Sequence, residues 1–171
     1  PLEAGEGLVF ESEITGATLP TEYFKPVEQG FKEAAQSGVV AGHPVVDIKA
    51  VLIDGSHHEV DSSEVAFKIA ASMAFKDACQ KASPFILEPV MLMEVVTPEE
   101  FLGDVLGDLQ SRRAQVQSMD AQTGLQIIKA FVPLAETFQY ATILRSNTTG
   151  RASFSQELDH YAPAPMIKKE A

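Results

Sequence analysis

The stretch ILEPVMLMEVVTPEEFLGDVLGDLQSRR, residues 86–113, decides the fold of the second half of the chain. Its first part, 86–97, is a nearly continuous apolar run and predicts a β-strand. Its second part, 97–113, has apolar residues at helical spacing and predicts an amphipathic helix. The apolar stripe of that helix consists of Phe101, Leu102, Val105, Leu106 and Leu109.

Both ends of this predicted helix carry terminal signals. Thr97 is the expected N-cap, Pro98 occupies the first helical position, and Glu100 completes a capping box. Arg112 and Arg113 lie at the other end, where the helix dipole favours positive charge. We therefore expect the helix to begin directly where the strand ends.

The remaining elements of this half complete a known order. They are strands over 114–122 and 125–133 around a Thr123–Gly124 turn, a helix and loop over 133–150, and a strand over 151–161. The order βαββαβ is that of ferredoxin-like folds, which place two helices on one face of a four-stranded antiparallel sheet. The sequence therefore predicts a ferredoxin-like βαββαβ sandwich here.

The first half has the order β-α-β-α, so the fold class of the whole chain is α+β with two small modules. Strands are predicted over 8–16 and 43–54, and helices over 19–38 and 62–81. The apolar residues at helical spacing are Tyr23, Val27, Phe31 and Ala34 in the first helix, and Val65, Ile69, Ala70 and Met73 in the second.

The composition limits the classes of function. The chain has 171 residues, a formal net charge of −11 and a single cysteine. The charge argues against a general binder of polyanions, and one cysteine excludes a disulfide framework and fits a reducing cytoplasm. No run of about 18 apolar residues suggests a membrane span. Because the chain begins almost directly before its first strand, we expect it to be a piece of a longer protein.

The stretch DGSHHEVDSSE, residues 54–64, is the most unusual in composition. Asp61 and Glu64 resemble a capping box, which makes the preceding residues a surface turn between a strand and a helix. The adjacent histidines, His57 and His58, could be solvated loop residues, metal ligands, catalytic groups or contacts to a partner. A zinc site needs three or four converging ligands, and catalysis needs a nucleophile or a partner that fixes the histidine tautomer.

No motif for nucleotide chemistry is present. The chain contains neither GxxxxGK[ST] nor GxGxxG, and no paired carboxylates lie on a known catalytic scaffold. Its histidines and cysteine are scattered, which predicts that it holds no structural metal: they are His43, His57, His58, His160 and Cys79. The residues alone therefore indicate two small α+β modules that bind rather than catalyse.

Long segments of the chain resemble the C-terminal part of bacterial translation elongation factor G. They are HPVVDIKAVLIDGSHHEVDSSEVAFKIAASMAFKDA (43–78), ILEPVM (86–91), TPEEFLGDVLGDLQSRR (97–113), FVPLAETFQYATILRSNTTGRASF (131–154) and DHY (159–161). The resemblance implies that 1–87 is domain IV without its first strand, with a truncated fold like domain 2 of ribosomal protein S5. It further implies that 88–165 is domain V, followed by a tail over 166–171.

The same resemblance implies a role for the histidine loop. In this family the loop lies at the far tip of domain IV and enters the decoding A site of the small ribosomal subunit during tRNA–mRNA translocation. The tip histidine of the family falls on His58. The implied contacts to the decoding site are Gly55, Ser56, His57, His58, Glu59, Asp61 and Ser62. A ring on a short loop can stack on a base and donate to a 2′-OH or a phosphate.

Other contacts with RNA are expected from the few cationic side chains. The candidates for phosphate contacts in the first module are Lys49, Lys68 and Lys76. Domain V of the family contacts the large-subunit rRNA, and the candidates there are Arg112, Arg113, Arg145, Ser146 and Arg151. The other interpretation of each of these residues is an ordinary solvated side chain. The acidic balance elsewhere need not oppose a local contact, because screening acts over about 8 Å at physiological salt.

The resemblance also implies that the chain has no catalytic or cofactor site, and it implies a location and a partner. No catalytic, cofactor-binding or metal-binding residue is expected in it, because GTP and Mg²⁺ belong to the GTPase domain of the intact factor. We expect a monomeric cytoplasmic protein whose partner is the ribosome. Two departures, Ala114 and Gln139, stand where the family commonly has glycine. They leave open a paralogue in ribosome recycling or drug displacement, and a free-standing binding protein is the other alternative.

Overall fold

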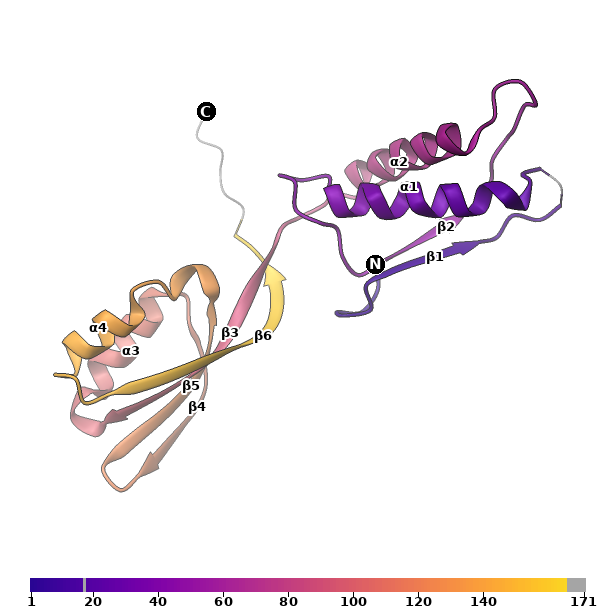
Figure 1. Cartoon of the computed structure of the whole chain (residues 1–171). Helices are drawn as coiled ribbons and strands as arrows, with labels where there is room; N and C mark the ends of the chain where they lie inside the picture. The colour runs from indigo at the N-terminus through magenta and orange to yellow at the C-terminus, as the bar shows by residue number, and fades with distance from the viewer. Residues whose placement is uncertain (17, 166–171) are drawn as a thin grey trace. The chain divides into compact units, whose positions relative to one another are not determined.

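The structure is a computed structural model that describes residues 1–16 and 18–165, and it divides the chain into two compact units. Unit 1 comprises Pro1–Ile86 and unit 2 comprises Leu87–Ala171 (Figure 1). The expected tail, 166–171, lies outside the described residues. No helix in the described ranges is long and apolar enough to cross a bilayer.

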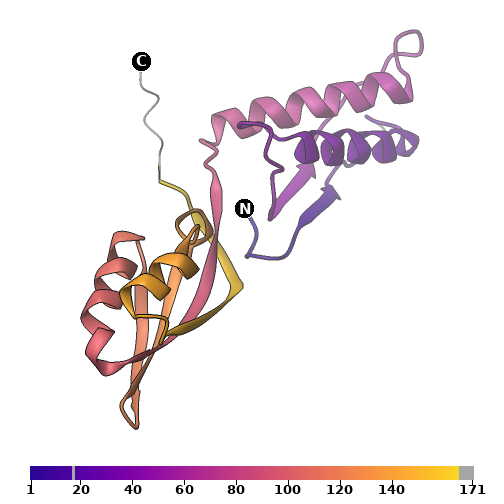
Figure 2. The same cartoon turned by 60° about the vertical axis from the view of Figure 1, so that its left-hand side comes forward.

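Unit 2 is a four-stranded antiparallel sheet with both of its helices on one face (Figure 2). Its elements are β3 (Leu87–Pro98), the 3₁₀ turn η2 (Glu99–Phe101), α3 (Leu102–Ser111), β4 (Gln115–Gln122), β5 (Leu125–Pro133), the 3₁₀ turn η3 (Leu134–Glu136), α4 (Tyr140–Asn147) and β6 (Ser153–Pro163). The strand order β4-β5-β3-β6 confirms the predicted ferredoxin-like topology.

The core of unit 2 lies between the helices and the sheet. Alternate residues of the two central strands point into it, as the period of a strand requires. The buried residues are Met93 and Val95 from β3, Ile128, Ala130 and Val132 from β5, Val105 and Leu109 from α3, and Tyr140 and Leu144 from α4. The amphipathic stripe expected for α3 therefore reaches the core through Val105 and Leu109.

Three helices enter through a proline and a 3₁₀ turn. Pro20, Pro98 and Pro133 all have φ −57°, with ψ of 138°, 145° and 136°, and a three-residue 3₁₀ turn follows each of them. The expectation that Thr97 caps a helix starting at Pro98 is wrong, because Thr97 is buried within β3. Proline holds the backbone extended for one more residue, so α3 begins only at Leu102.

Unit 1 is a parallel βαβ unit followed by a second helix. Its elements are β1 (Leu8–Ser12), the 3₁₀ turn η1 (Thr21–Tyr23), α1 (Phe24–Ser37), β2 (Ile48–Leu52) and α2 (Glu64–Lys81). The two strands pair with each other in register, Leu8 opposite Ile48 and Ser12 opposite Leu52. The strands are shorter than predicted, but the order of elements is the predicted one.

Helix α1 lies between the two strands and α2 (Figures 1 and 2). Phe31 is the central contact, since its ring lies 6.1 Å from that of Phe10 on β1 and 5.2 Å from that of Phe75 on α2. The helices approach most closely at Gly30, where an added Cβ would lie only 2.2 Å from the carbonyl oxygen of Lys68. Gly30 is therefore required by the packing of α1 on α2.

Helix α2 buries none of its residues completely and exposes one apolar side. Phe67 and Phe75 face neighbouring aromatic rings, but Val65, Ile69 and Met73 are exposed on another side of the helix. The predicted stripe is thus present in α2 but is not the part that packs. A further correction concerns the cap: the N-cap is Ser63, whose Oγ accepts a hydrogen bond from the N–H of Ala66, and not Asp61.

Candidate functional site

The histidine loop joins the end of β2 at Leu52 to the N-cap of α2 at Ser63. Parallel strands have their C-terminal ends at the same edge of a sheet, so this loop leaves the same edge as the chain that follows β1. That chain leads through residues 18–23 into α1. The two connections therefore form one end of unit 1, which we call the tip and define as residues 18–23 and 54–62.

Local hydrogen bonds fix the backbone on both sides of His58. Its N–H donates to Oγ of Ser62 over 2.8 Å. Its carbonyl oxygen accepts from the N–H groups of Asp61 and Ser62, at 3.2 and 3.0 Å. The residue is exposed, and within the described ranges its ring lies against no other aromatic ring. The loop therefore presents this imidazole to solvent on a backbone that local hydrogen bonds hold on both sides.

His57 has the opposite environment. Its Nδ1 lies 3.4 Å from the carbonyl oxygen of Thr18, and its ring centroid lies 6.5 Å from that of Tyr23. Tyr23 in turn stacks on Phe67 of α2, with 4.2 Å between centroids and 26° between planes. Two neighbouring residues of identical type are thus distinguished by the fold, since His57 is half-buried and His58 is exposed.

The other predicted tip residues fall into two groups. Gly55 packs against the buried side chain of Leu19, because an added Cβ would lie 3.1 Å from Cδ2 of Leu19. Ser62 holds His58, as described above. The three remaining residues are exposed: Ser56, Glu59 and Asp61.

Three residues beside the histidine loop are missed by sequence reasoning. They are Thr18, Leu19 and Tyr23, which precede α1 and meet the loop through the contacts given above. Helical spacing places Tyr23 in the apolar stripe of a helix. Nothing in the sequence indicates that these three residues lie beside a loop some 35 positions later.

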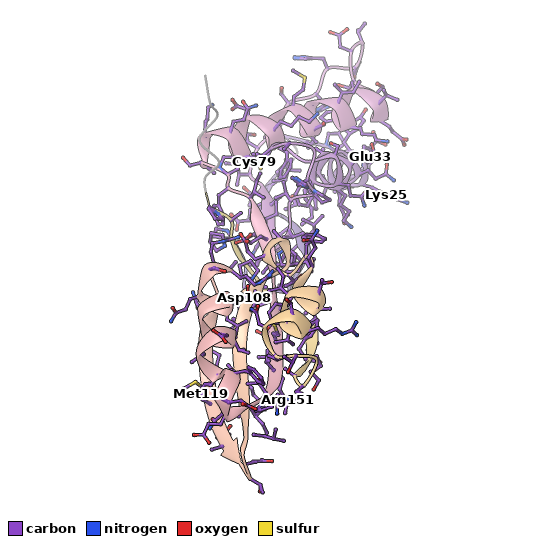
Figure 3. The ribbon with its side chains drawn as sticks, turned by 90° about the vertical axis from the view of Figure 1, so that its left-hand side faces the viewer. Lys25, Glu33, Cys79, Asp108, Met119 and Arg151 are labelled. Carbon is purple, nitrogen blue, oxygen red and sulfur yellow. The ribbon has the colours of Figure 1, made fainter. Side chains whose placement is uncertain are left out.

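The tip carries acidic rather than basic groups. Residues 18–23 and 54–62 contain no lysine or arginine, and their carboxylates are Glu22, Asp54, Glu59 and Asp61. The lysines expected to contact phosphate lie on the flanking elements, and two of them are paired. Nζ of Lys49 lies 2.6 Å from Glu11, and Nζ of Lys68 lies 2.6 Å from Glu33 of α1, which is labelled in Figure 3. Lys76 is exposed on α2.

Arg112 is a structural residue of unit 2 and not an available cation. It is only 8% exposed, and its Nε donates to Oδ2 of Asp108 over 2.8 Å. Its Nη1 donates to the carbonyl oxygens of Glu136 and Phe138, at 2.5 and 3.2 Å. The guanidinium also lies 5.0 Å from the centroid of the Tyr140 ring. Because these contacts occupy the guanidinium, we withdraw Arg112 from the candidate rRNA contacts.

Arg113 is also paired, although it is more exposed. It forms two hydrogen bonds to the carboxylate of Glu88, at 2.8 and 3.1 Å, and one to Glu136 at 3.1 Å. The hydrogen bond from Arg113 is the main reason why the pKa of Glu88 lies below its usual range. The backbone of Arg113 has φ +58°. The left-handed position after α3 is therefore Arg113 and not the following Ala114.

The last turn of α4 and the loop that follows it contain the remaining candidates. Thr148 is buried, and its Oγ1 donates to the carbonyl oxygen of Leu144 over 2.6 Å. This contact anchors the turn and leaves Arg145 and Ser146 exposed. Arg151, labelled in Figure 3, pairs with Glu100, and its guanidinium lies 4.7 Å from the centroid of the Phe101 ring. Among the described residues, Arg145 pairs with no carboxylate. It is therefore the best candidate of these cations for a contact with rRNA.

Neither the buried hydroxyl of Tyr140 in unit 2 nor the thiol of Cys79 in unit 1 belongs to a candidate site. Burial raises the pKa of Cys79, so its reactive thiolate form is disfavoured. Within 1–16 and 18–165, no group of three histidine, cysteine or acidic side chains converges to hold a metal ion. The expected absence of a structural metal remains a prediction for metal analysis of the purified chain.

Two family models together match the chain. The model described as elongation factor G, domain IV, matches residues 1–83, and the one described as the elongation factor G C-terminus matches 85–171. The chain is also similar to a crystal structure of a protein from Thermus thermophilus, with 44% identity and a TM-score of 0.83. That match covers 95% of this chain and 25% of the Thermus chain, so the chain spans about a quarter of its relative's length. The chain therefore belongs to the elongation factor G family and corresponds to its domain IV and C-terminal domain.

Proposed function

We propose that this chain is the ribosome-contacting C-terminal part of a translational GTPase that promotes tRNA–mRNA translocation. In this proposal, the tip of unit 1 enters the decoding A site. The observation that carries the proposal is the exposed ring of His58 on a loop ordered by Ser62. Membership of the elongation factor family gives that ring a ribosomal context.

The chemistry of His58 suits a contact with bases or sugars better than a contact with a line of phosphates. The acidic tip repels the phosphate backbone, whereas an imidazole can stack on a base or hydrogen-bond to a 2′-OH. Stacking of a base on an aromatic side chain is worth about 1–3 kcal/mol in single-strand binders. The proposed contact is therefore short-ranged and made by one or two side chains.

A second contact, made by unit 2 with the large-subunit rRNA, is proposed at the last turn of α4 and the loop that follows it. Arg145 and Ser146 are exposed there, and Arg151 lies at the end of the loop. Arg113 remains a weaker candidate because two carboxylates already engage it. A phosphate at Arg145 would gain charge-assisted hydrogen bonds without breaking an existing pair.

The other parts of the proposal concern the protein to which the chain belongs. We propose that this part is not itself catalytic and holds no cofactor, and that GTP and Mg²⁺ bind in a GTPase domain elsewhere in the polypeptide. A translation factor of this kind would act in the cytoplasm as a monomer. Steric occupation of the A site, and not chemistry within these two units, would be its contribution to translocation.

The test uses a chimera in which residues 1–165 replace the matching segment of an elongation factor G. His58→Ala should slow single-round translocation about tenfold, which corresponds to about 1.4 kcal/mol of lost transition-state stabilisation. Ribosome-stimulated GTP hydrolysis should be nearly unchanged, and the thermal midpoint of the 171-residue chain should stay within the range expected for an exposed residue.

The matched control is Val60→Ala, because Val60 is 92% exposed in the same loop. Val60→Ala should leave all three measurements unchanged. Normal translocation by the His58→Ala chimera would refute the tip contact. A collapse of the thermal midpoint would show instead that His58 supports the fold.

A paralogous role in ribosome recycling or drug displacement is the second candidate. It is favoured by Gln139, a non-glycine residue with φ +59° at a position where we expect glycine in the family. The same chimera distinguishes the two roles, because a recycling factor would split post-termination ribosomes but fail to support translocation.

A further inference from the structure

Residues 18–23, which precede α1, hold one half of the histidine loop. Tyr23 is the last residue of η1, and its ring lies 4.2 Å from that of Phe67 on α2 and 6.5 Å from that of His57 in the loop, measured between centroids. One aromatic side chain before α1 therefore contacts both the histidine loop and the helix that follows it, more than 30 residues later in the sequence.

Two further contacts of residues 18–23 support the same half of the loop. Leu19 is only 3% exposed and packs against Gly55, where an added Cβ would lie 3.1 Å from its Cδ2. The carbonyl oxygen of Thr18 lies 3.4 Å from Nδ1 of His57. The loop is thus supported from outside up to His57, whereas residues 58–62 are held by their own hydrogen bonds.

This division explains why His58 points to solvent. A His57 ring fixed against Tyr23 sets the backbone direction at the next residue, and the bonds to Ser62 then keep His58 in place. A side chain that is ordered before binding loses less conformational entropy when a partner arrives. The loss of the support at His57 would therefore weaken a contact made by His58 without touching His58.

We propose that Tyr23 is a positioning residue for His58 and acts through the ring of His57. The inference rests on the proposed role of His58 at the decoding site. Both contacts that Tyr23 makes here are contacts of its ring, so the planar ring and not the hydroxyl supplies the support. Tyr23→Phe should therefore behave as the wild type, and Tyr23→Leu, which removes the ring, should not.

The first test measures the order of the loop in the 171-residue chain. In Tyr23→Leu, the ¹H–¹⁵N heteronuclear NOE of residues 56–61 should fall clearly below its wild-type value, and Tyr23→Phe should restore it. Tyr161→Leu is the matched control, because Tyr161 is 58% exposed on β6 of unit 2. Unchanged NOE values in a folded Tyr23→Leu chain would overturn the proposal.

The second test is a double-mutant cycle in the chimera. Tyr23→Leu should slow translocation roughly threefold, and the Tyr23→Leu/His58→Ala pair should be about tenfold slow, no slower than His58→Ala alone. If Tyr23 only stabilises unit 1, the two effects multiply to roughly thirtyfold, and the positioning role is refuted.

The outcomes separate the two proposals. Normal translocation by the His58→Ala chimera would refute the proposed function of the tip, and the positioning role of Tyr23 would be refuted with it. A slow His58→Ala chimera, combined with normal loop order and normal translocation in Tyr23→Leu, overturns only the role of Tyr23. Successful rescue by Tyr23→Phe together with a non-multiplicative cycle supports both.

Discussion

Unit 1 and unit 2 each contain two helices and a sheet, but they differ in how completely the sheet covers the helices. In unit 2, four strands lie under α3 and α4, and a core of nine buried residues lies between the layers. In unit 1, two strands lie under α1, and α2 packs on α1 with no fully buried residue of its own.

This difference shows that apolar content and burial are separate properties of a helix. Helix α2 has apolar residues at helical spacing, yet three of them are exposed: Val65, Ile69 and Met73. Stability in unit 2 should therefore depend on its core side chains, whereas the stability of α2 in unit 1 should depend on its contact with α1. The following substitutions test that difference.

The largest difference in stability between the two units is expected when one aliphatic side chain is shortened in each of them. Leu109→Ala should lower the free energy of unfolding of unit 2 by about 3 kcal/mol, because Leu109 is 0% exposed and a cavity would remain. Ile69→Ala should change unit 1 by less than about 0.5 kcal/mol, because Ile69 is 55% exposed. Urea unfolding followed by amide cross-peaks in each unit measures both, and equal losses would break the comparison.

A somewhat smaller effect is expected from a buried arginine. Arg112→Ala leaves Asp108 and two carbonyl oxygens without their donor, and should cost unit 2 about 2–3 kcal/mol. Arg145→Ala, the exposed arginine of the same unit, should cost less than about 0.5 kcal/mol. Thermal unfolding of both variants is the measurement. If Arg112→Ala is as stable as the wild type, the hydrogen bonds of Arg112 do not contribute to the stability of unit 2.

The contact between α1 and α2 is tested by adding one methyl group. Gly30→Ala places a Cβ against the backbone of α2 and should destabilise unit 1 by about 1–2 kcal/mol, because the helices must move apart. In unit 2, Gly103→Ala meets no atom within 4 Å and should stabilise α3 by up to about 1 kcal/mol. Hydrogen exchange in the two helices measures the effects, and protection of α2 that survives Gly30→Ala would contradict the proposed dependence.

The smallest effect concerns an ion pair in unit 2 and its dependence on pH. The hydrogen bond from Arg113 lowers the pKa of Glu88, so the pair stabilises the folded state fully above the unfolded carboxyl pKa of about 4.3. That stability is lost as the pH falls through the lower pKa of the folded state. Glu88→Gln should therefore cost about 0.5–1 kcal/mol at pH 7, a value reduced by the partial exposure of Arg113.

The check is to compare wild-type and Glu88→Gln unfolding over a pH series. The difference between them should be greatest at neutral pH and should shrink toward zero in strong acid. A difference that grows on acidification would mean that Glu88 is held in its protonated form, contrary to the geometry.

The sequence is most informative where the backbone alone decides the structure. Thr123–Gly124 predicts the hairpin between β4 and β5, and both residues have positive φ, 44° and 81°, as a type I′ turn requires. Strand β5 has the predicted bounds. The predicted start of α3 is misplaced because a Thr-Pro pair can either cap a helix or end a strand, and only the burial of Thr97 decides between the two.

Side-chain roles are less predictable because they depend on segments that are distant in the sequence. Arg112 and Arg113 are neighbours of the same type, but Arg112 meets the carbonyl oxygens of Glu136 and Phe138 and becomes structural. The histidines of the tip differ for a similar reason, since Tyr23 reaches only one of them. Periodicity places a residue on a face of its own element, but it does not tell which other element covers that face.

The uncovered side of α2 also has a consequence for how copies of the chain behave at high concentration. An apolar strip on a protein surface favours association, whereas a net charge of −11 makes every pair of copies repel each other. The repulsion is long-ranged and screened by salt, over about 30 Å at 0.01 M and about 8 Å at 0.15 M, whereas contact between apolar side chains is not. Salt should therefore lower the second virial coefficient of the chain, and replacing Ile69 by lysine should make that coefficient less sensitive to salt.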